Sequence, residues 1–299
     1  KMEAPPFISL SSRVLPEFRE YERASTVVVN SYVGQVMSRY LGELEESLGH
    51  GLRVMQSSGG SITARLASEQ PVRTILSGPA GGVVGAFYTA VQAGYADIIT
   101  LDMGGTSTDV SLCPGRIKET NTSTVGGHPV SVPMIDIHTV GAGGGSIARV
   151  DAGGALVVGP QSAGAEPGPA CYKLGGKDAT VTDADVLLGY LNPEHLLAGD
   201  FKIDAELARK AINDNVAIPL NLSDVEAAHG IHTLVNSNMG RALRAVSSER
   251  GRDPRRFDLI CFGGGGPVHA VGLAEMLDIS RVVVPPFPGV FSSFGLLVA

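Results

Sequence analysis

The sequence predicts an α/β protein, and three observations lead to that class. Residues 257–284 read as a strand, a glycine turn, a helix and a second strand, which is the pattern of a right-handed parallel crossover unit. Residues 97–158 contain short apolar runs separated by Gly and Pro turns, which favours strands. Apolar residues at helical spacing recur on both sides of that region. We therefore expect a sheet flanked by helices.

The first third of the chain is expected to be mainly helical. A helix is predicted over residues 25–48, where apolar residues recur at helical spacing and Gly49 supplies an end signal. A short strand is predicted at Leu52–Gln56. A second helix is predicted over Pro79–Ala93, because a proline stands near its start and Gly94 just beyond its end.

The middle third is expected to be rich in strands. Asp97–Asp102 and Asp109–Cys113 are apolar runs on either side of a glycine-containing segment. The remaining strand predictions are Arg116–Glu119, Val130–Thr139, Ser146–Val150 and Ala155–Val158. Residues 159–177 are rich in Gly and Pro, so we expect a long irregular loop there.

The last third is expected to return to helix. Thr182 or Asp183 can cap a helix that runs through Tyr190, and another helix is predicted over Asp204–Asn213. Ser223 can cap a long amphipathic helix. The crossover unit then consists of a strand at Phe257–Phe262, a helix at Pro267–Leu277 and a strand at Arg281–Val284.

Composition narrows the function classes. The 299 residues carry a net charge of −7 without a basic stripe, which argues against a nucleic-acid surface. No apolar stretch approaches the ~18 residues of a membrane-spanning helix, and the N-terminus has no signal-peptide pattern, so we expect a cytoplasmic protein without a membrane partner. The three cysteines are too far apart to indicate a disulfide framework or a Cys-x-x-Cys metal site. Because the chain ends within an apolar run, we expect a fragment of a larger subunit.

The segment between Leu101 and Asp109 has the composition of a phosphate-binding hairpin. Gly104 and Gly105 allow successive backbone N–H groups to point at one anion. The hydroxyl residues that follow would complete the phosphate ligands: Thr106, Ser107 and Thr108. The alternative interpretation is an ordinary Gly-Gly hairpin with a polar tip.

Two acids flank this hairpin tip and are the candidate catalytic residues. Asp102 ends the first strand, where it would hold Mg²⁺ directly or through water. Asp109 opens the next strand and is the second candidate for holding the ion or orienting water.

A second glycine run separates a predicted strand from a predicted helix, and consists of Gly263, Gly264, Gly265 and Gly266. Four residues without side chains leave a loop face that adenosine or phosphate can approach closely. The spacing is not Gly-x-Gly-x-x-Gly, and no P-loop motif occurs, so the Rossmann and P-loop interpretations fail. The alternative is a tight strand-to-helix turn.

Asp136 and His138 are the candidate metal ligands. Strand periodicity would place both on one face, and a carboxylate beside an imidazole can bind a transition metal such as Zn²⁺ or Mn²⁺. His128 or His269 is the candidate third ligand. Alternatively, Asp136 only orients His138, or the two form a satisfied polar contact. The other histidines are interpreted as surface or helix residues: His50, His195, His229 and His232.

Taken together, these segments resemble the hydantoinase A/5-oxoprolinase family. The matching stretches, from about residue 25 to the C-terminal end, are Ser77–Gly82, Asp102–Asp109, Met134–Ser146, Ala165–Tyr172, Thr180–Leu188 and Phe262–Ala270. The resemblance implies an actin/hexokinase-like (ribonuclease H-like) ATPase fold over residues 1–299. It likens the Asp102–Thr108 hairpin to the second phosphate loop of that fold and Gly263–Gly266 to its adenosine loop, and it supports a metal near the Asp-x-His segment.

The same resemblance implies the function and the partners. The expected activity is ATP- and Mg²⁺-dependent ring opening of a cyclic amide or imide, such as 5-oxoproline or a hydantoin, with a partner subunit of the hydantoinase B type. Family members begin with an earlier Asp-x-Gly-Gly-Thr turn that is not found before Asp102, so we expect the fragment alone to be inactive. Two alternatives stay open: a subunit of an ATP-dependent ketone carboxylase, and a non-catalytic actin-like regulator that binds nucleotide.

Overall fold

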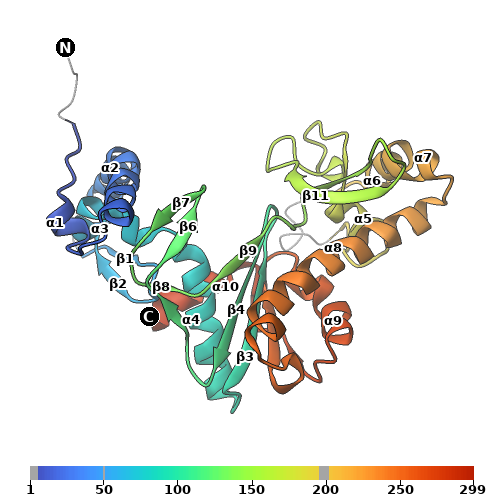
Figure 1. The fold of residues 1–299 in the computed structure, drawn as a ribbon. Coiled ribbons are helices and arrows are strands. Elements are labelled where there is room, and N and C mark those ends of the chain that lie inside the picture. Colours follow the sequence, from blue (N-terminus) through green and yellow to red (C-terminus); the bar gives the residue numbers. More distant parts are fainter. Residues whose placement is uncertain (1–5, 50, 195–201) are drawn as a thin grey trace. The chain divides into compact units, whose positions relative to one another are not determined.

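A computed structural model describes residues 6–49, 51–194 and 202–299, and the chain forms two compact units (Figure 1). Unit 1 consists of Lys1–Gln92, Arg116–Ile137 and Ser292–Ala299, and unit 2 of Ala93–Gly115 and His138–Phe291. His50 and His195 lie outside the described residues. No helix of the described part is long and apolar enough to cross a membrane.

A five-stranded mixed sheet forms the centre of unit 2 and confirms the predicted α/β class. In spatial order its strands are β14 (Val282–Val283), β13 (Asp258–Phe262), β3 (Asp97–Met103), β4 (Thr108–Pro114) and β9 (His138–Val140). Strand β13 runs parallel to β14 and β3, whereas β4 runs antiparallel to β3 and β9. The carboxyl ends of β3 and β13 therefore meet at one edge of the sheet, which is where ligands bind in open α/β sheets.

Two helices cover this sheet and supply its core. Helix α8 (Asp224–Val246) packs on β4 and β9, and α9 (Gly266–Met276) packs on β13 and β3 (Figure 1). Large apolar side chains from sheet and helices are fully buried between them, each contributing ~1.5–3 kcal/mol; they include Ile99, Leu101, Leu259, Ile231, Met239 and Leu273. Ser223 caps α8 as predicted, and Glu226 completes a capping box with it.

The rest of unit 2 consists of a small antiparallel sheet and further helical elements. Strands β11 (Leu156–Ser162), β10 (Ser146–Val150) and β12 (Ala179–Thr180) form an antiparallel sheet. The neighbouring helical elements are α5 (Val181–Leu187), α6 (Ala205–Ile212), α7 (Ile218–Leu220) and the short turns Ala170–Tyr172, Asn213–Ala217, Ser248–Arg250, Pro254–Arg256 and Pro288–Val290. The predicted caps of α5 are wrong, because Thr180 is the N-cap and Asp183 closes its capping box.

Unit 1 is built from helices and short strand pairs. Its helices are α1 (Ser11–Val14), α2 (Glu20–Leu48), α3 (Ala64–Glu69), the turn Pro71–Thr74, α4 (Ser77–Gln92) and, from Ser292 onward, α10 (Phe291–Val298). The antiparallel strand pairs are β1 (Arg53–Met55) with β2 (Ser61–Thr63), β5 (Glu119–Thr120) with β8 (Met134–Ile135), and β6 (Ser123–Val125) with β7 (His128–Val130).

Helical spacing identifies α2 but not its buried side. The apolar residues Val28, Tyr32 and Val36 are exposed by 66%, 85% and 71%. The buried face instead carries Thr26 and Asn30, whose side-chain oxygens accept hydrogen bonds from Ser131 N at 2.9 Å and Val72 N at 3.1 Å. Satisfied polar contacts therefore anchor this helix, a pattern that periodicity does not detect.

The single strand predicted over Val130–Thr139 is wrong. The segment divides into the end of β7, then β8, then β9, and the boundary between the two units passes between Ile137 and His138. Proline at position 133 cannot donate a ladder hydrogen bond, which favours such interruptions. Asp136 and His138 consequently belong to different units.

Candidate functional site

The turn between β3 and β4 forms an exposed, four-residue tip. Gly104 N–H donates to the Ser107 carbonyl at 3.0 Å and closes the turn. A β-carbon at Gly105 would meet no atom within 4 Å, and one at Gly104 would meet only the Ser107 carbonyl oxygen at 3.8 Å. No protein atom therefore blocks the outer side of Gly105 at this tip.

Asp102 and Asp109 are directly opposite each other on β3 and β4. Opposed residues of an antiparallel pair project from the same face, with β-carbons ~4.5–5.5 Å apart. Thr139 donates its hydroxyl proton to Asp109 Oδ1 at 2.5 Å. Burial raises the pKa of Asp109, and the Thr139 hydrogen bond reverses this only in part. Two carboxylates on one face repel each other unless a cation lies between them, so the pair suits a divalent ion.

The second glycine run packs directly against Asp102. Gly263 has φ +81°, and a β-carbon there would overlap Asp102 Oδ1 and the Met103 carbonyl, so only glycine fits. Gly265 N–H donates to that same carbonyl at 2.9 Å, at the point where α9 begins. A β-carbon at Gly264 would meet no atom within 4 Å, which leaves this residue open on its outer side.

Both glycine runs line one cavity of about 320 Å³, which we call the phosphate cavity. Gly104 and Gly105 form one wall, Gly264 and Gly265 a second, and Thr182 and Asp185 of α5 lie beside them. The predicted ligands that are not part of the lining are Thr106, Ser107, Thr108, Gly263 and Gly266. The Thr108 hydroxyl is buried and donates to the Ala142 carbonyl at 2.5 Å, so it is occupied within the fold.

A third glycine run, Gly143 to Gly145, packs against the backbone of the hairpin tip. Gly144 N–H and Gly145 N–H donate to the carbonyls of Gly104 and Gly105 at 3.0 and 2.6 Å. A β-carbon at Gly143 would lie 2.7 Å from the Gly105 backbone. These glycines therefore allow two backbones to approach closely, and they fix the shape of the open tip.

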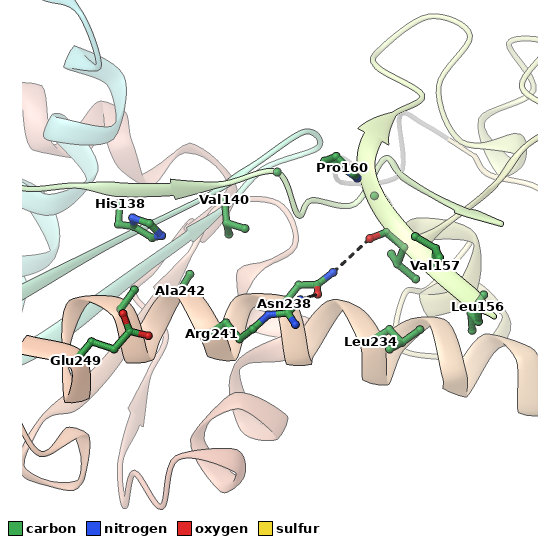
Figure 2. Close-up of a pocket in the computed structure, with 14 residues that line it drawn as sticks. His138, Val140, Leu156, Val157, Pro160, Leu234, Asn238, Arg241, Ala242 and Glu249 are labelled. Carbon is green, nitrogen blue, oxygen red and sulfur yellow. Dashed lines mark hydrogen bonds between the residues drawn. The ribbon is translucent and has the colours of Figure 1, made fainter. Parts of the chain in front are cut away.

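The predicted metal ligands Asp136 and His138 have separate surroundings. Asp136 lies in unit 1, where its carboxylate is 3.4 Å from Lys118 Nζ. His138 lies in unit 2 and lines a second cavity of about 570 Å³ (Figure 2). Figure 2 shows His138 and Val140 on β9 opposite the side chains of Arg241 and Glu249. Asp136 and His138 are both absent from the group of potential metal ligands that the structure brings together among the described residues.

His269, the third predicted ligand, belongs to a buried cluster with Asp185 and His232. His232 Nδ1 is 2.8 Å from Asp185 Oδ1, and His269 Nε2 is 3.3 Å from Asp185 Oδ2. Among the described residues, these three form the group of His, Cys, Asp and Glu whose ligand atoms all lie within 4.8 Å of one another. His232 is a helix residue, as one of the two interpretations of the sequence expects, but its side chain is only 12% exposed.

The charge of Asp185 is stabilised within this cluster. Burial alone would raise the pKa of Asp185, but its contacts with His232 and His269 hold the pKa below its ordinary value. The carboxylate is therefore ionised at neutral pH. Asp185 lies in the stretch Thr180–Leu188 that resembles the family, but no spacing in the sequence brings it together with His232 and His269, because the three residues come from three separate helices.

Replacing Asp109 by Asn should raise the melting temperature of the metal-free protein. A raised folded-state pKa means that protonation of Asp109 stabilises the fold, so stability is fully present below the ordinary value of 3.8 and is lost as pH rises through the raised pKa. Asn keeps an oxygen that accepts the Thr139 hydroxyl. Thermal unfolding with a chelator should show the gain at about pH 7 and its loss at about pH 3. A gain of equal size at both pH values would refute this explanation.

Comparison with known proteins gives consistent matches. The hydantoinase/oxoprolinase family matches residues 23–299. Caprolactamase subunit alpha of Pseudomonas jessenii is 42% identical over 98% of this chain and 43% of the relative. The solved structure of ATP-dependent caprolactamase from that organism has a TM-score of 0.81 over 96% of this chain and 42% of its own.

Two further relatives extend this similarity to other reactions. A nucleotide-free acetone carboxylase structure, from work on ATP-dependent acetone carboxylation, is 36% identical with a TM-score of 0.87, over 96% of this chain and 41% of its own. The 5-oxoprolinase of Saccharomyces cerevisiae is 36% identical over 98% of this chain and 24% of the relative. The chain thus spans less than half the length of these relatives. On this evidence the chain belongs to the hydantoinase/oxoprolinase family.

Proposed function

We propose that the enzyme containing this chain uses ATP to open the ring of a cyclic amide or imide, such as 5-oxoproline or a hydantoin, and that this chain binds the phosphates. The observation that carries the proposal is the phosphate cavity, where two glycine runs with open backbone meet beside Asp102. Membership of a family that includes caprolactamase and 5-oxoprolinase relatives supports the reaction class.

The residues present fit ATP and Mg²⁺. Phosphate needs N–H donors without side chains in front of them, and Gly105 and Gly264 leave that space open. Mg²⁺ is usually held by one or two carboxylates together with phosphate oxygens and water. Asp102 and Asp109 supply such a pair on one face of the hairpin. Helix α9 begins at the second glycine run, so its positive end adds to the attraction for phosphate.

ATP would supply the phosphoryl group that makes the amide carbon electrophilic. The amide oxygen bonds to the γ-phosphorus as the bridging P–O bond to ADP breaks. One water would then add to the carbon and the ring nitrogen would leave with a proton, as an amine from a lactam or as a ureido nitrogen from a hydantoin, and a second water would release phosphate from the acyl group. The products are the ring-opened acid, ADP and phosphate. This chain's share is to position the phosphates and to balance their charge through the cation held by Asp102 and Asp109.

A substrate panel on the complete enzyme, with its proposed partner subunit of the hydantoinase B type, tests the reaction. ADP release should depend on 5-oxoproline, a hydantoin or another lactam. Incorporation of labelled bicarbonate into a ketone, without amide-dependent ADP release, would instead identify a carboxylase. If the native assembly keeps its full activity when Asp102 is replaced by Ala, the chain is a nucleotide-binding regulator and the proposal fails.

The Gly264→Ala variant should bind nucleotide about ten-fold more weakly, a change of ~1.4 kcal/mol, with an unchanged melting temperature. Its β-carbon meets no atom of the protein, but it enters the phosphate cavity. Calorimetric titration with ATP and Mg²⁺ measures the affinity. Gly289→Ala is the matched control, because that β-carbon also meets nothing and lies outside the cavity lining. If Gly264→Ala and Gly289→Ala bind ATP with equal affinity, the phosphates do not bind in the phosphate cavity.

A further inference from the structure

We propose that Asp185, His232 and His269 bind a divalent transition-metal ion, of the Zn²⁺ or Mn²⁺ type, at the wall of the phosphate cavity. The three side chains come from α5, α8 and α9, of which α5 and α9 both pack on α8. Their side chains are 4%, 12% and 0% exposed. The site is distinct from the Asp102–Asp109 pair, which offers only oxygen ligands.

The separations between the candidate ligand atoms fit a small ion. Two ligands at ~2.0–2.1 Å from a tetrahedral Zn²⁺ are ~3.3 Å apart. In the structure, His269 Nε2 lies 3.3 Å from Asp185 Oδ2, which matches this value, and His232 Nδ1 lies 2.8 Å from Asp185 Oδ1, a hydrogen-bond distance that would widen by ~0.5 Å around an ion. Two imidazoles and one carboxylate are a ligand set for first-row transition metals rather than for Mg²⁺, which prefers oxygen.

The Nε2 atom of His269 directs a lone pair towards the carboxylate of Asp185. Its Nδ1 is 2.8 Å from Asn236 Oδ1, an acceptor, so Nδ1 carries the ring proton. In the neutral ring, Nε2 then has a lone pair. That atom is fully buried and has no hydrogen-bond partner of good geometry among the described residues, and Asp185 Oδ2 lies 3.3 Å from it. A lone pair that faces a carboxylate is unfavourable unless a cation lies between them.

The two imidazoles stack beside the carboxylate. The His232 and His269 rings are 4.5 Å apart, with an angle of 18° between their planes. The ligand atoms of both rings and of Asp185 all lie within 4.8 Å of one another. One ion could therefore be shared by the two rings and the carboxylate. Asn236 would then act as the orienting partner of a metal-bound histidine.

Asp185 connects the site to the phosphate cavity, because it lies on the wall of that cavity. Three protein ligands leave a position for an oxygen of water or of a bound molecule, as in catalytic metal sites. An ion here would therefore be accessible to small oxygen ligands such as water, a carboxylate or an amide carbonyl. Binding of the ion by these three residues does not require that the enzyme open a cyclic amide.

Metal content and spectroscopy on the complete protein test the inference. After removal of metals and reloading with Zn²⁺, elemental analysis should find one more tightly bound ion per copy of this chain in the wild type than in His232→Ala or Asp185→Asn. Co²⁺ loading should give a tetrahedral visible band in the wild type that both variants lack. Zn²⁺ should raise the melting temperature of the wild type more than that of the variants.

His229→Ala is the matched control, because His229 lies on the same helix and is exposed. It should retain the additional ion and the visible band. Equal metal content in the wild type and both site variants, with no Co²⁺ band lost, would overturn the inference. If the variants do not fold, anomalous diffraction from Zn²⁺-loaded wild-type crystals decides. A peak between the three side chains supports the site, and its absence refutes it.

Discussion

The Asp102→Asn variant of the complete enzyme is expected to lose at least ~100-fold in ATP-dependent turnover. Asp102 is the second-last residue of β3, lies beside the second glycine run and is paired with Asp109 across the hairpin. Asn has nearly the same shape but no charge, so the cation would be held by one carboxylate instead of two. The loss should appear mainly in kcat and in the Mg²⁺ concentration required, because the glycine backbone still binds the phosphates.

The control for this variant is Asp97→Asn, which removes an exposed carboxylate at the opposite end of the same strand. It should leave turnover unchanged. Steady-state kinetics across a series of Mg²⁺ concentrations measures the loss of turnover. Circular dichroism shows whether the variant is still folded. Turnover within about two-fold of wild type in Asp102→Asn would mean that the hairpin does not hold the catalytic cation.

The Asp183→Ala variant is expected to lose ~3–5 kcal/mol of stability. Asp183 is fully buried, and its carboxylate accepts hydrogen bonds from Ala170 N at 3.2 Å, Cys171 N at 2.8 Å, Thr180 N at 3.0 Å and Thr180 Oγ1 at 2.7 Å. Alanine would leave these buried donors unpaired. Because the bonds fix the start of α5, the change should also weaken nucleotide binding by displacing Thr182 from the cavity wall.

Denaturant unfolding measures this loss, with Asp178→Ala as the control. Asp178 is an exposed acid two residues before the cap of α5, and its removal should cost less than ~0.5 kcal/mol. Asp183→Asn should fall between the two, because one amide oxygen can still accept hydrogen bonds. A loss below ~1 kcal/mol for Asp183→Ala would contradict the anchoring role of this carboxylate.

Structural features that depend on residues close together in the sequence were predictable. The central strands, the cap of α8 at Ser223 and the two glycine runs follow from apolar runs, capping residues and turn residues. The pairing of Asp102 with Asp109 also follows locally, because a four-residue turn fixes the register of the hairpin. The phosphate cavity could therefore be anticipated as two open glycine runs at the carboxyl ends of neighbouring strands.

Features that depend on packing between distant helices were not predictable. Asp185, His232 and His269 meet only because α5, α8 and α9 pack together, and none of them lies in a recognisable ligand motif. Asp136 and His138 were grouped by an alternation that holds only within one strand, and β8 ends before Asp136. Likewise, α2 buries Thr26 and Asn30 through hydrogen bonds, whereas its periodic apolar residues are exposed.

A crystal structure of the complete enzyme with ADP and Mg²⁺ tests the central claim most directly. We expect the phosphates within hydrogen-bonding distance of the Gly105 and Gly264 amides, with Mg²⁺ held on the Asp102–Asp109 side of the hairpin. The larger cavity lined by His138, Arg241 and Glu249 is the competing position in unit 2. Phosphate density in that cavity, with the hairpin tip free of nucleotide, would contradict the assignment.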